Sequence, residues 1–359
     1  MGLERLSIQN VRVIAEAELE PSAHLNVVTG GNGSGKTSLL EAIHILGLGR
    51  SFRTQDAAKV IRDGQTELVV FGKISDGGTH ALGVKRSRQG TSIRIDGEAV
   101  NRLATLAEHL PLLVVTPQSH RLLEAGRSYR REYIDWGVFH VEPEFFPQWQ
   151  RYRRALSQRN RLLKGRPRPE MLRPWTETLL EAGQGLDRWR RQYLEELGPY
   201  VAQYAEALLD LKDVELVYRP GWAQGLELAQ ALDEAHAADL ERGFSTIGPH
   251  RAELRLRAGG KDLLDRVSRG QQKLLVYVLK LAQIHQLRER TGKRSVLLLD
   301  DLGAELDVEH RRGLLTLLAE QQSQVIVTAT EPEQVDPTGW PDTRWFHVEQ
   351  GQIRQDPIL

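Results

Sequence analysis

The stretch GGNGSGKT, Gly30–Thr37, matches the pattern G-x-x-x-x-G-K-[ST]. The apolar run LNVVT at 25–29 precedes it and predicts a buried strand that ends at the first glycine. A helix is predicted after it, because apolar residues from Leu39 to Leu46 recur on one helical face. A strand, a glycine-rich turn and a helix in this order form the phosphate-binding loop of nucleotide-binding proteins.

The residue types of this loop suit a bound nucleoside triphosphate with Mg²⁺. Glycines let the backbone N–H groups wrap the phosphates, Lys36 reaches the β- and γ-phosphates, and the Thr37 hydroxyl holds the metal. The alternative is a glycine-rich turn that matches by chance, and the flanking strand and helix argue against it. The predicted nucleotide-binding residues are Gly30, Gly31, Asn32, Gly33, Ser34, Gly35, Lys36, Thr37 and Ser38.

A second motif, SVLLLDDLGAELD at 295–307, predicts an apolar strand that ends in two carboxylates. We expect Asp300 to position Mg²⁺ and Asp301 to orient the attacking water. An acidic turn after a parallel strand is the alternative, which the phosphate-binding loop disfavours. Lys36, Asp300 and Asp301 are therefore the predicted catalytic residues. Aspartate is one methylene shorter than the glutamate often found at the second position, so slow hydrolysis is expected.

The spacing of these motifs narrows the class of ATPase. From Lys36 to Asp300 is 300 − 36 = 264 residues, whereas a small GTPase or a simple P-loop kinase places its metal aspartate much closer. A long insertion, followed by a polar helix entry just ahead of the acidic strand, is the layout of an ABC-type ATPase head. ATP is therefore the expected nucleotide.

The polar helix entry lies in DRVSRGQQKLLVYVLKLAQ, residues 265–283. Its segment VSRGQ resembles the ABC signature LSGGQ, with the matching residues Ser268, Arg269, Gly270 and Gln271 after Val267. The resemblance implies that this helix end caps the γ-phosphate bound by a second subunit. Taken alone, the stretch is equally an ordinary core helix with Ser268 as its N-cap.

Periodicity elsewhere predicts an α/β fold of the ABC-type head class, with a mixed sheet, an antiparallel N-terminal sheet and an inserted helical arm. Residues 67–100 alternate as an antiparallel sheet, and LLVVT at 112–116 is a short buried strand. After about residue 119 two helical patterns follow, separated by KGRPRP at 164–169. The predicted segments are 1–118 for the N-terminal part of the head, 119–245 for the helical lobe and 246–359 for the C-terminal part.

Composition adds limits rather than a function. The chain has 359 residues, 48 Lys and Arg against 48 Asp and Glu, and no cysteine. Polyanion binding must therefore come from local patches, and zinc-thiolate sites and thiol catalysis are excluded. We found no run apolar enough to span a bilayer and no signal peptide, so no membrane partner is expected, and the lack of cysteine fits a reducing cytoplasm.

Several motifs together resemble the RecF recombination-mediator ATPases, which are relatives of the chromosome-maintenance (SMC) heads. The match covers nearly the whole chain. It rests on the phosphate-binding loop and the SFRT element at 51–54, on YRREYID at 129–135, on GPHRAEL at 248–254, on SRGQQK and on DDLGAELD. Ala304 departs from the serine common in the family, and Thr328 and Thr330 lie where transporter ATPases carry a switch histidine.

The resemblance implies an ATP-dependent homodimer that binds duplex and gapped DNA, hydrolyses ATP slowly with DNA stimulation, and helps recruit RecR with RecO for RecA loading. It also implies a role in DNA repair and replication-fork maintenance, in the bacterial cytosol or nucleoid. Gln118 occupies the place of a nucleotide-sensing glutamine, although a surface glutamine is the alternative.

DNA contacts are predicted from local charge. Residues 151–173 contain nine Lys or Arg and one acid, Glu170, which suits phosphates or, alternatively, a solvated helix face. The predicted DNA-binding candidates are Arg130, Arg131, Arg151, Arg154 and Lys164. Arg130 and Arg131 could equally hold parts of the protein together, and Arg53, Arg127 and Arg251 are further candidates.

Two other classes share these motifs. A transporter ATPase subunit would carry them, but with a switch histidine and a shorter insertion. An SMC-like head acting as a nucleotide-dependent scaffold would also carry them, with a long coiled coil in place of helices of tens of residues. DNA-stimulated hydrolysis discriminates between these classes.

Overall fold

The computed structural model describes residues 2–75, 77–165 and 167–356. Contacts divide the chain into two compact units, which are described separately: unit 1 comprises Met1–Ser119 with Leu287–Leu359, and unit 2 comprises His120–Gln286. The predicted segments 1–118, 119–245 and 246–359 remain a prediction of functional organisation. By contacts, residues 246–286, which include the signature stretch, group with unit 2.

Unit 1 contains an antiparallel sheet of the predicted kind. Its strand order is β2-β1-β4-β5-β6-β7. Alternating residues such as Leu68, Val70 and Ile74 point to the buried face, as expected for a sheet with one solvated side. The strands are β1 Gly2–Val11, β2 Ile14–Leu19, β4 Glu67–Ser75, β5 Thr79–Ser87, β6 Gly90–Ile95 and β7 Glu98–Val100.

The second sheet of unit 1 has the order β15-β14-β3-β13-β12-β8, and all its neighbours are parallel except the β14–β15 hairpin. β12 and β13 are buried along their whole length, which explains why they are continuous apolar runs rather than alternating ones. The strands are β3 Leu25–Thr29, β8 Leu112–Val115, β12 Val296–Leu299, β13 Gln324–Ala329, β14 Thr343–Glu349 and β15 Gln352–Asp356.

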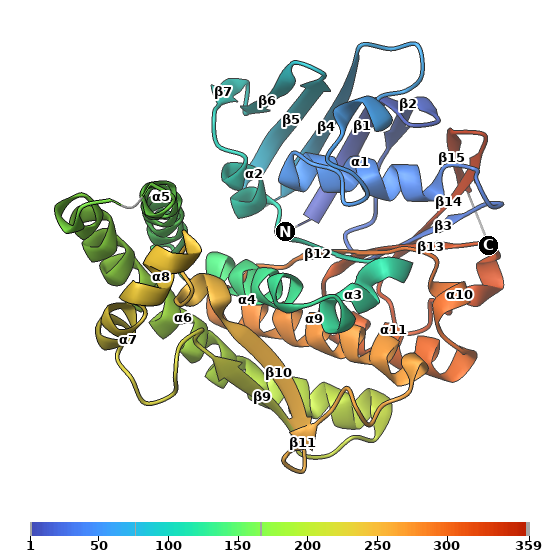
Figure 1. Cartoon of the computed structure of the whole chain (residues 1–359). Helices are drawn as coiled ribbons and strands as arrows, with labels where there is room; N and C mark the ends of the chain where they lie inside the picture. Colours follow the sequence, from blue (N-terminus) through green and yellow to red (C-terminus); the bar gives the residue numbers. More distant parts are fainter. Residues whose placement is uncertain (1, 76, 166, 357–359) are drawn as a thin grey trace. The chain divides into compact units, whose positions relative to one another are not determined.

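Helix α1, Lys36–Leu48, lies between the two sheets, and α11, Val308–Glu320, lies on the opposite face of the parallel sheet (Figure 1). The predicted apolar face of α1 is present, but the helix is buried nearly all round, including Ser38, Glu41 and His44. The single-face pattern in the sequence understates this burial because sheets pack on both sides. The other helices of unit 1 are α2 Ala104–His109 and α10 Leu302–Glu305, with 3₁₀ turns at Ala57–Lys59, Pro117–His120 and Pro332–Gln334.

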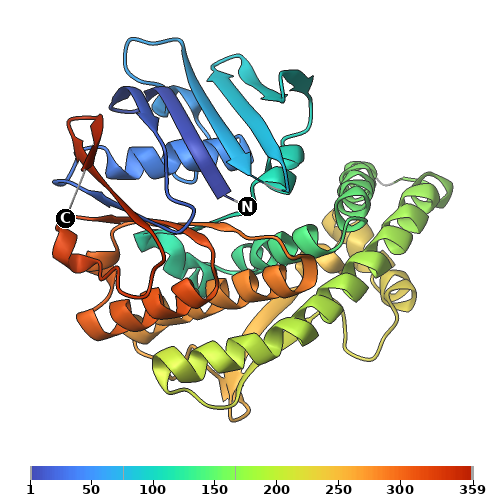
Figure 2. The ribbon, with the colours of Figure 1, turned by 180° about the vertical axis from the view of Figure 1, so that it is seen from behind.

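Unit 2 is built on two long helices, as predicted. α5, Phe145–Leu163, packs on α6, Pro169–Leu209, and the predicted Gly/Pro break separates them (Figure 2). α6 continues through Pro174 and Pro199, which are both exposed. The other helices are α3 Arg121–Glu124, α4 Arg127–Val141, α7 Leu228–Glu234, α8 His236–Arg242 and α9 Arg269–Thr291, whose last residues belong to unit 1.

A three-stranded sheet, β11-β10-β9, completes unit 2. β9, Val214–Arg219, is the strand predicted around 214–218, whereas β10, Glu253–Ala258, and β11, Lys261–Asp262, were not predicted. β10 alternates buried leucines with arginines, because one face packs inward and the other meets solvent. None of the described helices is long and apolar enough to cross a membrane.

The close packing of α4 on α6 gives a test of this fold. A Cβ atom on Gly137 of α4 would lie 2.0 Å from the Tyr193 ring of α6, whereas a Cβ on Gly198 of α6 meets nothing within 4 Å. We expect Gly137→Ala to lower the free energy of unfolding by about 1–3 kcal/mol through overpacking. Gly198→Ala should raise it by up to about 1 kcal/mol, because alanine is the better helix former. Urea denaturation of both variants checks this, and equal effects would contradict the packing.

Candidate nucleotide-binding site

The predicted site residues of unit 1 gather at the carboxyl edge of the parallel sheet. The phosphate-binding loop follows β3, the two aspartates follow β12, Thr330 follows β13, and Gln118 follows β8. These strands are neighbours in the order β3-β13-β12-β8 and run parallel, so their carboxyl ends meet at one edge. Ligands of open α/β sheets bind at this edge.

The loop from Gly30 to Gly35 requires glycine where the chain passes closest to its neighbours. Gly30 has φ 149°, and a Cβ there would lie 2.3 Å from the Val348 carbonyl oxygen. The hairpin turn between β14 and β15 also holds the loop, because the Gly351 N–H donates to the Ser34 carbonyl at 2.7 Å. The Ser34 hydroxyl is buried without a hydrogen-bond partner. A phosphate oxygen would satisfy such a group, so the loop fits the predicted nucleotide.

Lys36 lies inside this loop. Its Nζ donates to the carbonyl oxygens of Gly30 at 2.6 Å and Gly31 at 3.0 Å. Burial lowers the pKa of Lys36 below its ordinary value, while the charges on Asp301 and Asp300 oppose that change. The two carbonyls thus hold the ammonium at the loop, next to the acidic end of β12.

Asp300 connects the phosphate-binding loop to two further strands. It accepts hydrogen bonds from the Thr37 hydroxyl at 3.0 and 3.2 Å, and from the Thr328 hydroxyl of β13 at 3.0 Å. Thr328 is fully buried and also accepts from the Asp301 N–H at 2.8 Å. Burial raises the pKa of Asp300, and the hydrogen bonds from Thr37 and Thr328 oppose this. Hydroxyl and carboxylate oxygens in contact are a donor set that suits Mg²⁺.

The role of Thr328 was not predicted. In the sequence, Thr328 was noted only because it lies where transporter ATPases carry a switch histidine. The pattern of QVIVTAT does not indicate that its hydroxyl contacts both aspartates. Thr330 is engaged differently, since its N–H and hydroxyl donate to the Gln334 side chain at 3.0 and 3.1 Å. Gln118 lies in the 3₁₀ turn after β8 with an exposed side chain.

A buried ionic network behind α1 was also missed. Glu41 is completely buried and accepts hydrogen bonds from Arg12 at 2.8 and 2.9 Å and from the Ser51 hydroxyl. Ser51 in turn accepts from the N–H groups of Arg53 and Thr54. The charge on Arg53 also lowers the pKa of Asp300, against the dominant effect of burial. The network therefore holds the SFRT element against the helix that starts at Lys36.

The signature stretch lies in unit 2, at the start of α9. The Ser268 N–H donates to the Gln271 side chain at 2.9 Å, and the Gln271 N–H donates to the Ser268 hydroxyl at 3.3 Å. This reciprocal pair is a capping box, and Arg269 and Gly270 form the first turn. The predicted N-cap is present. A capping box is compatible both with an ordinary core helix and with a signature that binds nucleotide.

The predicted DNA-binding candidates differ in availability. Arg130 pairs with Glu253 at 2.7 Å and Arg131 donates to the Ala252 carbonyl at 3.0 Å, so both hold α4 to the start of β10 within unit 2. Arg154 and Lys164 are exposed, and Arg151 is exposed but paired with Glu181 at 2.9 Å.

The basic block 151–173 needs one correction. Arg159 is only 1 % exposed and forms a 2.7 Å ion pair with the fully buried Asp239. It also donates to Ser245 at 2.6 Å, so it ties α5 to α8 and the following loop and does not face solvent. Sequence alone could not separate it from its exposed neighbours, because its partner is 80 residues away. Arg166 lies outside the described residues.

The GPHRAEL element forms a buried polar centre in unit 2. The Tyr152 hydroxyl lies 2.7 Å from His250 Nδ1, and His250 Nε2 lies 3.1 Å from the Ser245 carbonyl oxygen. Because a carbonyl only accepts, Nε2 carries the proton and Nδ1 accepts from the tyrosine. Burial lowers the pKa of His250 to about 4.

Fold and site together define a class of protein, the P-loop ATPase heads of the ABC and SMC type. The same fold occurs in the Smc head bound to the C-terminal winged-helix domain of ScpA. Its TM-score is 0.60 at 14 % identity, with 99 % of this chain and 97 % of the Smc chain covered.

The chain belongs to the RecF family. Residues 2–351 match the family described as RecF/RecN/SMC N terminal domain. The DNA replication and repair protein RecF of Shewanella sp. (strain MR-7) is 42 % identical over 98 % of this chain and 99 % of that protein. RecF of Pseudomonas putida (strain KT2440) is 43 % identical over 99 % and 98 %.

A solved structure agrees with this assignment. The RecF–ATP structure of the recombination mediator in the RecFOR pathway has a TM-score of 0.88 and 26 % identity, covering 99 % of this chain and 97 % of that one. The resemblance to RecF and the ABC-type head fold are therefore confirmed. Family membership also separates the chain from transporter ATPase subunits, the first alternative considered.

The pKa of His250 predicts how stability depends on pH. A histidine that is neutral in the folded protein gains protons on unfolding between pH 6.5 and about 4, so stability falls as the pH falls through this window. Lowering the pH from 7.5 to 5 should therefore reduce the free energy of unfolding by about 2 kcal/mol through this residue alone. The His250→Gln variant keeps a donor and an acceptor but does not titrate. We expect its free energy of unfolding to fall by about 2 kcal/mol less than that of wild type over the same pH range. Urea denaturation of wild type and variant at both pH values checks this, and an equal loss of stability in the two proteins would contradict it.

Proposed function

We propose that this protein is an ATP-dependent DNA-binding protein of recombinational repair, acting as a homodimer that ATP closes. The observation that carries the proposal is the contact between Thr37 of the phosphate-binding loop and Asp300 after β12, at 3.0 Å. It joins a nucleotide loop to a metal-binding aspartate. Support for the DNA role comes from the relatives, which are named as DNA replication and repair proteins and as a recombination mediator of the RecFOR pathway.

Each residue of the site has a proposed role. The loop Gly30–Thr37 with Ser38 binds the phosphates of ATP, and the orphaned Ser34 hydroxyl is available to one of their oxygens. Lys36 leaves its carbonyl partners for the β- and γ-phosphates. Thr37 and Asp300 hold Mg²⁺, which neutralises phosphate charge when bound. The described residues contain no cluster of three or more His, Cys, Asp or Glu suited to a metal, as expected where phosphates complete the shell.

Asp301 is the proposed base that orients the attacking water. Its backbone adopts the left-handed conformation, with φ 58°, and Thr328 fixes its N–H. The short aspartate side chain supports slow turnover, since a base is effective only within hydrogen-bond reach of the water. DNA stimulation of hydrolysis is part of the proposal. Gln118, exposed at the same sheet edge, is the proposed sensor of the bound nucleotide.

The proposed dimer rests on the resemblance of the start of α9 to the ABC signature. Lys36, Thr37 and the two aspartates belong to unit 1, whereas Ser268–Gln271 belong to unit 2. We propose that the signature of one subunit caps the ATP of the other, as in ABC ATPases. Nucleotide binding energy would then favour the closed dimer over the monomer.

The closed dimer is proposed to bind duplex and gapped DNA and to recruit RecR with RecO. The exposed cations Arg151, Arg154 and Lys164 are the available candidates for phosphate contacts. Arg130 and Arg131 are weaker candidates because their guanidinium groups already have partners. Binding through phosphates would fall steeply with salt and show little sequence preference.

The split site predicts the behaviour of two variants. Asp301→Asn should bind ATP without hydrolysing it and double in mass with ATP·Mg²⁺, but remain monomeric with ADP·Mg²⁺. Lys36→Met should remain monomeric in both, because the loop loses its only phosphate-binding ammonium. Light scattering checks both masses. A constant monomer for Asp301→Asn in ATP would contradict closure by nucleotide alone.

A third variant tests the proposed contact between the signature and the nucleotide of the second subunit. Ser268 is exposed at the start of α9, so Ser268→Arg should leave unit 1 and its ATP affinity intact while blocking the trans contact. We expect ATP binding within about twofold of wild type by fluorescent-nucleotide titration, and no dimer by light scattering. Glu289→Arg, an exposed residue near the other end of α9, is the matched control. Normal dimerisation of Ser268→Arg would exclude the trans-signature mechanism.

A further inference from the structure

Unit 2 contains an arginine-lined hollow of about 440 Å³ that the nucleotide site does not use. Its walls come from β9, β10, the start of α4 and the segment after α8. Two aromatic side chains, Trp222 and Phe244, share the wall with Glu253 as the one carboxylate. We call this hollow the arginine pocket, and its cations are Arg127, Arg219, Arg242, Arg251 and Arg255.

Positive charge in the arginine pocket is not balanced by the protein. Glu253 is shared by Arg127 at 2.8 Å and by Arg130 at 2.7 Å, so one carboxylate serves two guanidinium groups. Arg255 has only a 3.9 Å contact with Asp262. Within the described part of the chain, Arg219 and Arg242 form no ion pair. Five guanidinium groups against one carboxylate attract an anion, and guanidinium matches phosphate geometry bidentately.

Arg251 adds a buried donor without a partner. Its Nε is shielded from solvent and makes no hydrogen bond, while another nitrogen of the same group reaches the Ser245 carbonyl at 3.4 Å. Leaving a donor of a charged group unpaired costs free energy. The guanidinium also lies over the Phe244 ring, 5.3 Å from its centroid. Arg251 therefore lines the pocket with a guanidinium whose hydrogen bonds are incomplete.

The aromatic side chains supply flat apolar surface beside these donors. Phe244 is 38 % exposed, which is unusual for a large apolar residue in this fold. The Trp222 indole N–H donates to the Leu226 carbonyl at 3.0 Å, which fixes the ring at the pocket wall. Cations that follow a backbone, interleaved with aromatic rings that accept bases, are the usual platform for single-stranded nucleic acid.

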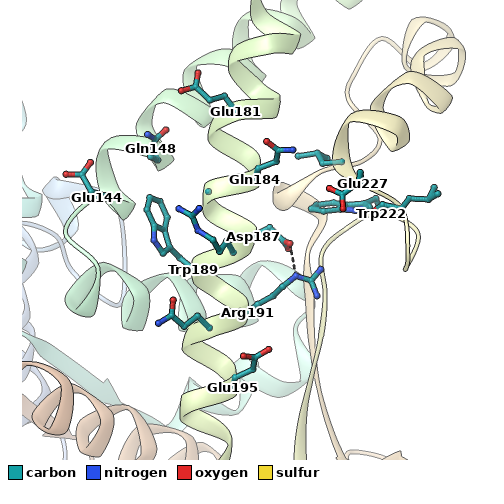
Figure 3. Close-up of a pocket in the computed structure, with 15 residues that line it drawn as sticks. Glu144, Gln148, Glu181, Gln184, Asp187, Trp189, Arg191, Glu195, Trp222 and Glu227 are labelled. Atoms are coloured by element: carbon teal, nitrogen blue, oxygen red, sulfur yellow. Dashed lines mark hydrogen bonds and ion pairs between the residues drawn. The ribbon is translucent and has the colours of Figure 1, made fainter.

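A neighbouring hollow has the opposite charge, and Trp222 borders both. Its lining carries five carboxylates and two arginines, including Glu181, Asp187 and Glu227 (Figure 3). Asp187 pairs with Arg191 at 2.7 Å and Glu181 with Arg151 at 2.9 Å, so three carboxylates and one arginine remain in the lining and the net charge is negative. Phosphates would be repelled there and attracted on the arginine side of Trp222. The change of charge at Trp222 would therefore direct an anionic chain toward the arginine pocket.

We propose that the arginine pocket binds the phosphate and base of an unpaired nucleotide in a single strand. A volume of about 440 Å³ admits a nucleotide unit and excludes a duplex. The proposal rests on the proposed function in taking DNA as the source of the strand, and it assigns a site separate from the basic block 151–173. An acidic peptide is the competing ligand, but it offers no base to stack on the exposed Phe244 ring.

Binding of labelled oligo-dT, followed by fluorescence anisotropy without ATP, tests the site. Arg219→Glu and Arg242→Glu, both exposed and unpaired within the described residues, should weaken binding about tenfold or more. Each should flatten the slope of log K against log salt by about 0.7 per lost phosphate contact. Phe244→Ala should weaken binding with an unchanged slope, because it removes stacking alone. Lys261→Glu, exposed on β11 outside the pocket, is the matched control and should bind like wild type.

The outcomes separate the possibilities. Wild-type affinity for oligo-dT in both arginine variants, or no binding by wild type, overturns the proposal. Competition by a poly-Glu peptide that exceeds competition by unlabelled oligo-dT also overturns it, in favour of an acidic protein segment. ATP-dependent duplex binding, measured in parallel, should be retained by Phe244→Ala. If wild type fails to bind duplex DNA with ATP, the proposed function is contradicted. The arginine pocket is then tested by the oligo-dT measurements alone.

Discussion

The contact between Thr37, Asp300 and Thr328 is the constraint on which unit 1 depends. It joins the loop after β3, the end of β12 and the end of β13, although Thr37 and Asp300 are 263 residues apart in the chain. Asp300 is 9 % exposed, so its carboxylate requires hydrogen-bond donors, and the two threonines supply them. With the strands parallel and adjacent, the loop is held open by its own glycines and by the β14–β15 turn.

Unit 2 depends on buried polar pairs rather than on a sheet edge. Arg159 with Asp239 joins α5 to α8 at 2.7 Å, and Arg190 with Asp135 joins α6 to α4 at 2.8 Å. Breaking such a pair leaves a buried charge without compensation, so each favours one arrangement of α4, α5, α6 and α8. Cations used in this way are unavailable to DNA. The arginines on β9, β10 and after α8 remain free of such pairs and therefore define a distinct charged surface.

Much of the fold was predictable because its signals are local. Glycine spacing at 30–35, continuous apolar runs at 25–29 and 296–299, and the break at 164–169 each reflect neighbouring residues. β10 was missed although its leucines and arginines alternate as in a half-buried strand, because a run of six residues gives only a short signal. The full burial of α1 was missed because both covering sheets come from distant segments. Thr328 escaped notice because a hydroxyl in a strand acquires its role only when β13 lies beside β12.

The sequence by itself determined the class of protein and predicted the chemistry of the nucleotide site, since the loop, the paired aspartates and the signature are short motifs that can be recognised from neighbouring residues alone. Only the tertiary structure decided which Lys and Arg side chains are free to contact DNA phosphates. Arg151, Arg159 and Arg251 are the same residue type, but one is exposed, one is buried in an ion pair, and one lines a hollow with its Nε buried and unpaired. The physical reason is that burial and pairing depend on residues brought together from distant positions, which a charge pattern does not encode.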